Sequence, residues 1–377
     1  MNLNRTQIKT DFNGDFCFTH ARGVILDNGF GIMTTQPLRL SGCDVFYGMY
    51  ILRTSDGGKS WTKPEPSKTL IRKAIGAGLE MAICDATPFY HEKSGKILLI
   101  GQSATYLNDE LAAHSKRYTL YSVYDEASGD FSPFEIVDTP YPDTLFYSAG
   151  SGSSQFVIED NGDILIPLYH MDIEKSKNPW NNCYKSSVMR CAFDGKRLSF
   201  IKIGASLSIE VPRGLYEPSL IKHGGKYFLA LRADSSGYIA IGDDGLNFGA
   251  PRELVWENGE SIGNYCTQQH WISLGGRLYL VYTRRGADND NVFRHRAPLF
   301  IAELDTERMC LIKSTEQIAV PNRGARLGNF GAQSRGGDAF IFASEWMQTT
   351  EPDQTDYKKC MCYGSDNSIF VVHITES

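Results

Sequence analysis

Carboxyl side chains that could act as acid and base flank short apolar runs in this sequence. Asp85 stands in Cys-Asp-Ala-Thr-Pro, Glu217 in Glu-Pro-Ser-Leu and Glu345 in Ser-Glu-Trp-Met-Gln. Glycoside hydrolysis needs one carboxyl to protonate the leaving oxygen and another to assist at the anomeric carbon. Asp85 is the candidate acid/base, with capping of the following Ala-Thr-Pro turn as its structural alternative.

Arginines from well-separated parts of the chain suit an anionic ligand. Arg22, Arg232 and Arg284 are the best candidates, with Arg296 of the Arg-His-Arg run in reserve. Planar guanidinium groups bind carboxylate or sulfate through two parallel hydrogen bonds. For each of these arginines, the structural alternative is an ion pair with Asp or Glu that links neighbouring blades of the fold predicted below.

The strands that must position these side chains follow a recurring hairpin pattern. Each copy has a polar residue, a short apolar strand, a glycine-containing turn and a second apolar strand. Asn-Gly and Gly-Gly centres are typical of tight hairpins, because such turns need positive φ. The turn glycines, at intervals of 66, 67, 63, 51 and 61 residues, are Gly29, Gly95, Gly162, Gly225, Gly276 and Gly337.

Each period leaves room for two further strands, as in YILRTSDGGKSWTKP after the first hairpin. Four strands per period, with few helical patterns between them, predict an all-β fold, a six-bladed β-propeller with four-stranded antiparallel blades. We expect residues 1–377 to form one such domain. Residues 368–375 are expected to pair with the N-terminal segment and close the ring.

Propeller geometry predicts that the polar residues meet at one mouth. In each hairpin the turn lies at one face, so the start of the inner strand and the end of its neighbour share the other face. Burying so many polar groups without partners would cost about 1–3 kcal/mol each, which favours a binding role. Besides the carboxyls and arginines above, the expected pocket residues are His20, His170, Gln269, His270 and Asn329.

Two patterns resemble the sialidase family of glycoside hydrolases. Thr54-Ser-Asp56-Gly-Gly58-Lys-Ser-Trp61 fits that family's Asp-box, S/T-x-D-x-G-x-T/S-W, and residues 243–248 form a weaker copy. Glu217 and Arg232, 15 residues apart (232 − 217), resemble the family's Glu on an inner strand and Arg on the adjacent strand. The resemblance implies a six-bladed propeller hydrolase in which Glu217 activates a tyrosine nucleophile.

The position of that tyrosine departs from the family pattern. Sialidases supply it late in the chain, after a third arginine, whereas no tyrosine lies between Arg285 and Asp356. Tyr265 and Tyr216 are the candidate substitutes, and we take Tyr265 as the third catalytic residue. The polar stretch 282–300 is expected to overhang the pocket.

The leading hypothesis is a glycoside hydrolase for an acidic or polyhydroxylated sugar, with Asp85 and Glu217 as the working carboxyls. The first alternative is a polysaccharide lyase acting on uronates, with His20 or Tyr265 among the candidate bases and arginine neutralising the acid. The second is a non-catalytic carbohydrate-binding propeller. In each case the expected partner is a small carbohydrate or oligosaccharide.

Composition limits the other classes of function. The chain has 38 Lys and Arg against 44 Asp and Glu, a net charge of −6, which argues against a nucleic-acid partner. It lacks an apolar run of about 18 residues, so no membrane span is expected. The N-terminus lacks the apolar stretch of a secretory signal, which predicts a cytoplasmic protein unless a leader has been removed.

The sequence predicts neither a cofactor nor a metal ion. It has no Gly-rich phosphate loop between a strand and a helix, and no His/Cys cluster with metal-ligand spacing. The nine cysteines are scattered and odd in number. They are expected to be reduced and mostly buried.

Overall fold

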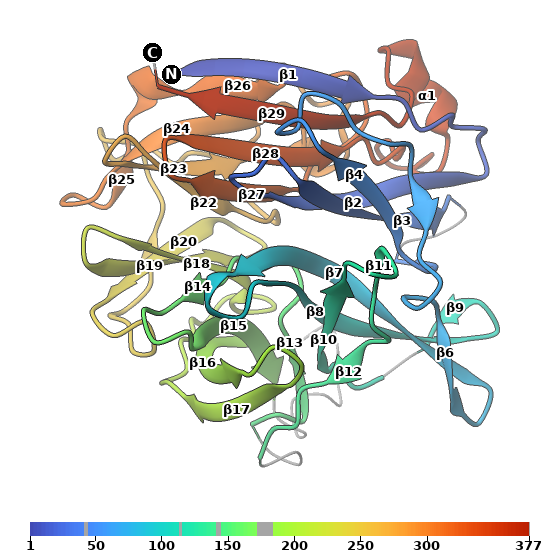
Figure 1. Ribbon diagram of the computed structural model, residues 1–377. Coiled ribbons are helices and arrows are strands. Elements are labelled where there is room, and N and C mark those ends of the chain that lie inside the picture. Colours follow the sequence, from blue (N-terminus) through green and yellow to red (C-terminus); the bar gives the residue numbers. More distant parts are fainter. Residues whose placement is uncertain (41–43, 113–114, 141–144, 172–183, 377) are drawn as a thin grey trace. The chain divides into compact units, whose positions relative to one another are not determined.

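The computed structural model describes residues 1–40, 44–112, 115–140, 145–171 and 184–376. Within these residues the strands form six antiparallel sheets (Figure 1). Contacts within the chain divide it into two compact units, and each unit contains three of the sheets. Unit 1 is Met1–Asp44, Tyr50–Glu65 and Glu253–Ser377, and unit 2 is Val45–Met49 and Pro66–Arg252.

Unit 1 has two four-stranded sheets and one five-stranded sheet. The first is β2 (Phe16–Ile25), β3 (Gly31–Arg39), β4 (Tyr50–Thr54) and β5 (Glu65–Pro66). The second is β1 (Asn2–Ile8), β29 (Ile369–Thr375), β28 (Asp338–Ser344) and β27 (Gly331–Arg335). The third is β22 (His270–Leu274), β23 (Arg277–Tyr282), β24 (Leu299–Asp305) and β25 (Cys310–Leu311), with β26 (Gln317–Val320) also paired to β24.

Unit 2 has sheets of seven, five and four strands. The first is β6 (Lys73–Gly76), β7 (Leu79–His91), β8 (Lys96–Leu107), β10 (Thr119–Asp125) and β11 (Asp130–Phe131), with β9 (Glu110–Leu111) on β8 and β12 (Glu135–Ile136) on β10. The second is β13 (Ser148–Gly150), β15 (Ile164–Met171), β16 (Lys185–Phe193) and β17 (Leu198–Ile203), with β14 (Val157–Ile158) on β15. The third is β18 (Tyr216–His223), β19 (Lys226–Arg232), β20 (Gly237–Gly242) and β21 (Arg252–Glu253).

Helical structure in the described residues is confined to short turns. The α-helix α1 (Tyr357–Cys362) begins at Asp356, whose side chain accepts a hydrogen bond from the Lys358 N–H. Single 3-10 turns are η1 (Glu92–Ser94), η3 (Phe293–His295) and η4 (Lys313–Thr315). The expectation of a protein with few helices is confirmed.

The predicted hairpins are confirmed at all six positions. Their strand pairs are β2/β3, β7/β8, β14/β15, β18/β19, β22/β23 and β27/β28. The loop between His223 and Lys226 has two residues, Gly224 and Gly225, with φ of 56° and 77°. Positive φ at both positions gives the turn a twist that matches the flanking strands.

The expectation of four strands in every sheet is wrong for three of the six sheets, which have five, five and seven strands. The additional strands β9, β12, β13 and β26 each pair with a strand that already has its expected neighbours. In β7 and β8 the pairing runs from Leu79↔Leu107 to His91↔Lys96, far beyond the predicted hairpin. That length leaves free edges on which β6 and β9 add.

The first and last strands of the chain pair with each other, as predicted. β1 lies antiparallel to β29 over seven residue pairs, from Asn2↔Thr375 to Ile8↔Ile369. β29 continues the sheet to β28 on its other side. Figure 1 shows β1 and β29 side by side at one edge of this sheet.

Apolar side chains from adjacent sheets interlock within each unit. In unit 1, Ile25 and Met33 of the first sheet pack with Phe340 and Phe342 of the second. In unit 2, side chains of β8 such as Leu98 pack against those of β15, and β15 packs in turn against β18 and β19. Each fully buried side chain of this size contributes about 1.5–3 kcal/mol of transfer free energy. The cores therefore lie between sheets, as face-to-face packing requires.

The segment from Thr54 to Trp61 forms a tight, hydrogen-bonded turn. The Thr54 hydroxyl accepts from the Gly58 N–H at 3.1 Å and donates to Asp56 Oδ1 at 2.8 Å. Asp56 also accepts from the Ser60 N–H at 3.0 Å and from its hydroxyl at 2.6 Å. These hydrogen bonds hold the pKa of Asp56 well below its usual value, and the bond from the Ser60 side chain has the largest effect. The Trp61 indole packs on the core of unit 1 beside Phe342.

Seven of the cysteines lie among the described residues, where they are thiols rather than disulfides. Six are buried and Cys362 is exposed, which fits the expectation of reduced, mostly buried thiols. Cys43 and Cys183 lie outside the described residues. None of the helices described is long and apolar enough to cross a membrane.

Candidate functional site

Asp85 lies at a β-bulge inside a long strand, rather than at a strand start as predicted. The pairing of β7 with β8 shifts between Cys84 and Thr87, so Asp85 and Ala86 together face Gly101. Asp85 adopts a left-handed backbone with φ 53°. A bulge of this kind re-aims a side chain. The conformation costs a non-glycine residue about 1–2 kcal/mol.

The same irregularity occurs at two other predicted site residues. Glu217 has φ 46° at a register shift between β18 and β19. His20 has φ 57° at a register shift between β2 and β3. Backbone outliers of this type cluster at functional sites, where the surrounding structure holds them. Three sheets thus present a polar residue at equivalent bulges.

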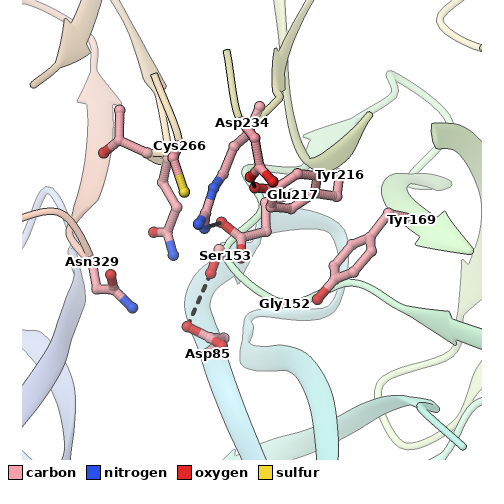
Figure 2. A network of polar contacts seen from close by, with 12 residues as sticks. Asp85, Gly152, Ser153, Tyr169, Tyr216, Glu217, Asp234, Cys266 and Asn329 are labelled. Atoms are coloured by element: carbon pink, nitrogen blue, oxygen red, sulfur yellow. Dashed lines mark hydrogen bonds and ion pairs between the residues drawn. The ribbon is translucent and has the colours of Figure 1, made fainter. Parts of the chain in front are cut away.

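Asp85 is buried and hydrogen-bonded on both carboxylate oxygens. The Ser153 hydroxyl donates to Oδ1 at 2.9 Å, the bond dashed in Figure 2. The Gln102 amide donates to Oδ2 at 3.1 Å, and the Tyr169 hydroxyl donates to Gln102 Oε1 at 2.8 Å. A Cβ on Gly152 would lie 2.3 Å from Gln102 Cδ, so glycine is required there to leave room for the amide.

Glu217 forms an ion pair with Arg232 on the neighbouring strand of the same hairpin. Arg232 Nη1 lies 2.5 Å from Glu217 Oε2, and the two side chains are 7% and 12% exposed. The alternative that this pair links neighbouring blades is wrong, because β18 and β19 are hydrogen-bonded partners in one sheet. Tyr216 lies under the Arg232 guanidinium, 4.6 Å from the ring centroid, and its hydroxyl donates to Asp234. Figure 2 shows Tyr216, Glu217 and Asp234 grouped together.

Tyr169 connects the surroundings of Asp85 and Glu217. Burial raises the pKa of the Tyr169 phenol; Arg117 lowers it, while the carboxylates of Glu217 and Asp85 raise it further. Both carboxylates therefore lie within electrostatic range of one hydroxyl. The Arg117 guanidinium lies 4.7 Å from the Tyr169 ring and 5.8 Å from the Tyr184 ring. Sequence reasoning missed Arg117 and Tyr184, because neither stands in the hairpin pattern.

His170 completes the set of predicted residues in unit 2. It is buried, and its Nε2 lies 3.0 Å from the Ser187 hydroxyl and 3.3 Å from that of Ser206. Unit 2 therefore contains Asp85, His170, Glu217 and Arg232. The other predicted residues belong to unit 1, namely His20, Arg22, Tyr265, Gln269, His270, Arg284, Arg296, Asn329 and Glu345.

Arg22 is fully buried beside a neutral histidine in unit 1. Its Nη2 donates to Gln268 Oε1 at 2.9 Å and its Nε to the Phe330 carbonyl at 3.1 Å. Burial, reinforced by the charge of Arg22, lowers the pKa of His270 to about 3. His270 packs edge-on against the Phe330 ring, 4.9 Å between centroids. An uncharged imidazole at this position avoids repulsion with the guanidinium.

Arg296, Asn329 and His20 form a second polar group in unit 1, in which Arg296 and His20 are buried and Asn329 is half-buried. The Asn329 amide lies 2.7 Å from His20 Nε2, and Arg296 Nη1 donates to Asn329 Oδ1 at 3.4 Å. Arg296 also donates to the Cys266 carbonyl. A separate bond joins the predicted Gln269, through Oε1, to the Asn264 amide at 3.1 Å.

Arg284 and Glu345 are held by contacts that need no ligand. Arg284 makes a two-pronged pair with Glu316, at 2.8 Å from Nε and 2.7 Å from Nη2. The structural alternative for the arginines is met here in its ion pair but not in its linkage of blades, because Arg284 and Glu316 adjoin β23 and β26 of one sheet. Glu345 Oε2 accepts backbone N–H bonds from Asp366 and Ser368, each at 3.0 Å, and burial raises its pKa to about 7.

Tyr265 contacts a histidine that sequence reasoning did not single out. Its hydroxyl lies 2.5 Å from His295 Nδ1, and His295 Nε2 lies 3.1 Å from Asp290 Oδ1. Both His295 and Asp290 belong to the polar stretch 282–300. Part of the polar content of this stretch thus bonds to Tyr265 and within the stretch itself, and its expected place over the pocket stays a prediction.

No group of three or more His, Cys, Asp or Glu side chains among the described residues could hold a metal ion. The arginines, carboxylates and tyrosines are instead suited to binding a polar organic molecule. Carboxylates can transfer protons, and guanidinium groups can bind an anionic substituent.

Solved structures resemble this chain along nearly its whole length. A protein of unknown function from Dyadobacter fermentans aligns over 99% of each chain, with a TM-score of 0.66 and 14% identity. Trypanosoma rangeli sialidase aligns over 99% of this chain and 60% of its own, with a TM-score of 0.64 and 11% identity. A Hadza microbial sialidase aligns over 98% and 68%, with a TM-score of 0.65 and 10% identity.

These similarities extend to the fold alone. No family model matches the sequence, and no curated protein does. The chain spans about 60% of the length of the Trypanosoma rangeli enzyme. The fold is an all-β β-propeller.

Proposed function

We propose that this protein is a glycoside hydrolase of the sialidase-like superfamily that acts on an acidic or polyhydroxylated sugar. The observation that carries the proposal is the pair Asp85 and Glu217, which lie at equivalent strained bulges. Both carboxylates raise the pKa of the Tyr169 phenol. In this proposal Asp85 protonates the leaving oxygen and Glu217 assists at the anomeric carbon. Arg232 orients Glu217.

The proposal extends to the architecture. The six sheets are the six blades of one propeller domain spanning residues 1–377, and the turn from Thr54 to Trp61 is an Asp-box. The hydrogen bonds that Gly58 donates to the Thr54 hydroxyl and Ser60 donates to the Asp56 carboxylate support the assignment of the Asp-box. The substrate is a small carbohydrate or oligosaccharide.

The direct test is release of sugar from a panel of chromogenic sialosides, uronides and neutral glycosides. We expect turnover of at least one acidic glycoside by the wild type. Asp85→Asn and Glu217→Gln should each lower kcat/KM by about 100-fold or more, as loss of acid–base catalysis does. Asp138→Asn and Glu126→Gln, at exposed carboxyls outside this site, are matched controls and should retain activity.

Two outcomes would contradict the proposal. Unchanged turnover by both site variants would show that these carboxyls do no chemistry. An unsaturated product that absorbs in the near ultraviolet would identify the reaction as elimination by a lyase rather than hydrolysis.

A further inference from the structure

Three side chains of unit 1 form a continuous phenol–imidazole–carboxylate chain. Tyr265 Oη lies 2.5 Å from His295 Nδ1, and His295 Nε2 lies 3.1 Å from Asp290 Oδ1. The Tyr265 and His295 rings are tilted by 59° with 5.7 Å between centroids, so the contact is made through the hydroxyl rather than by stacking. A nucleophile bonded to a base, and the base bonded to a third orienting group, is the arrangement that activates weak nucleophiles.

The directions of the two hydrogen bonds follow from the carboxylate. An ionised Asp290 only accepts, so His295 Nε2 carries the proton that it donates. Nδ1 is then the unprotonated nitrogen of the neutral ring and accepts from the Tyr265 hydroxyl. Burial raises the pKa of Tyr265, against the opposing charge of Arg285, so the phenol is protonated near neutral pH and requires a base to react.

The backbone around this chain is held in an unusual conformation. Arg294 and His295 are consecutive non-glycine residues with φ of 52° and 53°. The buried Asn289 amide fixes the loop by donating to the carbonyls of His295 at 3.3 Å and Ala297 at 2.6 Å. Strained residues that the surroundings hold in place point to function.

Positive charge surrounds the phenol. The Arg285 guanidinium lies 4.7 Å from the Tyr265 ring centroid, and Arg294 donates to the Cys266 thiol beside it at 3.3 Å. Both arginines are exposed, and neither has a carboxylate within ion-pair distance in the part of the chain that is described. Arg296 also acts on Tyr265 electrostatically. This charge fits a substrate that carries an anionic group.

We propose that Tyr265 is a nucleophile, that His295 is its general base and that Asp290 positions the imidazole, for attack on an anionic glycoside. The Tyr265 O–H proton passes to His295 Nδ1 as Oη bonds to the electrophilic carbon. The electron pair of the broken C–O bond leaves with the departing oxygen, which takes the proton that the general acid of the reaction supplies. The imidazolium then returns its proton through solvent to that acid, so the protons balance. This inference rests on the proposed function in one respect only, namely that the carbon attacked by Tyr265 belongs to a glycoside.

The test measures the phenol directly, without any sugar. Wild-type protein is treated with N-acetylimidazole, and acetylation of each tyrosine is followed by peptide mass spectrometry. We expect Tyr265 to react faster than Tyr363, which is 61% exposed, despite being less accessible.

Substitutions separate the roles. His295→Asn should slow acetylation of Tyr265 by about 10-fold or more, and asparagine tolerates the positive φ at this position. Asp290→Asn should slow it only about 2–5-fold, because the Asp290 side chain is 99% exposed and its pair is weakened by water. His373→Asn is the matched control, since His373 bonds to Asp338 and should leave the rate unchanged.

Equal Tyr265 acetylation rates in wild type and His295→Asn would overturn the role of His295 as the base. Circular dichroism and the melting temperature of each variant confirm that it is folded. Since no sugar takes part, such a failure would leave the assignments of Asp85 and Glu217 untouched.

Discussion

Asp85 and Glu217 occupy the same structural position in two sheets of unit 2. Each is the first of two residues that face a single residue of the partner strand, and their φ angles are 53° and 46°. Glycine would adopt this conformation at lower cost. A charged residue in this strained conformation destabilises the fold while the conformation fixes the direction of its side chain. Such strain is typical of functional residues rather than of structural ones.

The bulge at Asp85 depends on Gly101. A Cβ at that position would lie 2.6 Å from the Cys84 carbonyl and 2.7 Å from Ala86 Cβ. We expect Gly101→Ala to lower the free energy of unfolding by about 1–3 kcal/mol, as overpacking does. Chemical denaturation measures it, and Gly337→Ala, whose Cβ meets nothing within 4 Å, should change stability by less than about 0.5 kcal/mol. Equal effects of the two substitutions would contradict the packing argument.

Arg284 acts with Glu316 as a structural pair. Their side chains are 18% and 14% exposed, and Tyr282 also donates to Glu316 at 2.6 Å. Arg284→Met should therefore destabilise the fold by about 1–3 kcal/mol, because it leaves a partly buried carboxylate without its cation. In a double-mutant cycle, adding Glu316→Gln should cost less than the two single losses combined. Strict additivity would show that the pair contributes nothing.

Glu345 should make stability depend on pH. Burial raises its folded pKa from 4.5 to about 7, so between these values the folded state keeps a proton that the unfolded state has lost. The free energy of unfolding should fall as pH rises through this window, by on the order of 3 kcal/mol. Glu345→Gln retains an acceptor for the two backbone N–H groups and removes the effect. Comparing the variant with wild type at each pH cancels the opposite slope from His270, and parallel pH curves would refute the shift.

The Thr54 hydroxyl anchors the turn that ends at Trp61. Thr54→Val keeps the shape and removes the bonds to Gly58 and Asp56, so we expect a loss of about 1–2 kcal/mol in unfolding free energy. Lys59→Ala in the same turn alters an exposed side chain and should be near neutral. A loss in the Lys59 variant as large as that in Thr54→Val would show that the hydroxyl is not the anchor.

The hairpins could be predicted because their signals are local. Period-2 apolar strands and turn glycines such as Gly224–Gly225 lie within about 15 residues of each other, and the structure pairs them as expected. The pairing of β1 with β29 could be predicted for a different reason. A strand at the edge of a sheet has unpaired N–H and C=O groups, so the last strand needs a partner.

The partners of the site residues could not be read from the sequence. Tyr265 meets His295 across 30 residues, and Arg284 meets Glu316 across 32, in segments without periodic pattern. The bulges were missed because a left-handed Asp or Glu looks like any other residue in a strand. The place of Asp85 inside β7 was therefore not foreseen, and its role as acid/base stays a prediction.

Pairing of β1 with β29 sets an order of events during synthesis. Residues 66–252 of unit 2 leave the ribosome as one run and can complete their sheets early. Asn2–Ile8 are translated long before their hydrogen-bonding partner, Ile369–Thr375. Strand β1 therefore remains without its partner through the translation of more than three hundred codons, and during that time its edge is exposed to pairing with other chains.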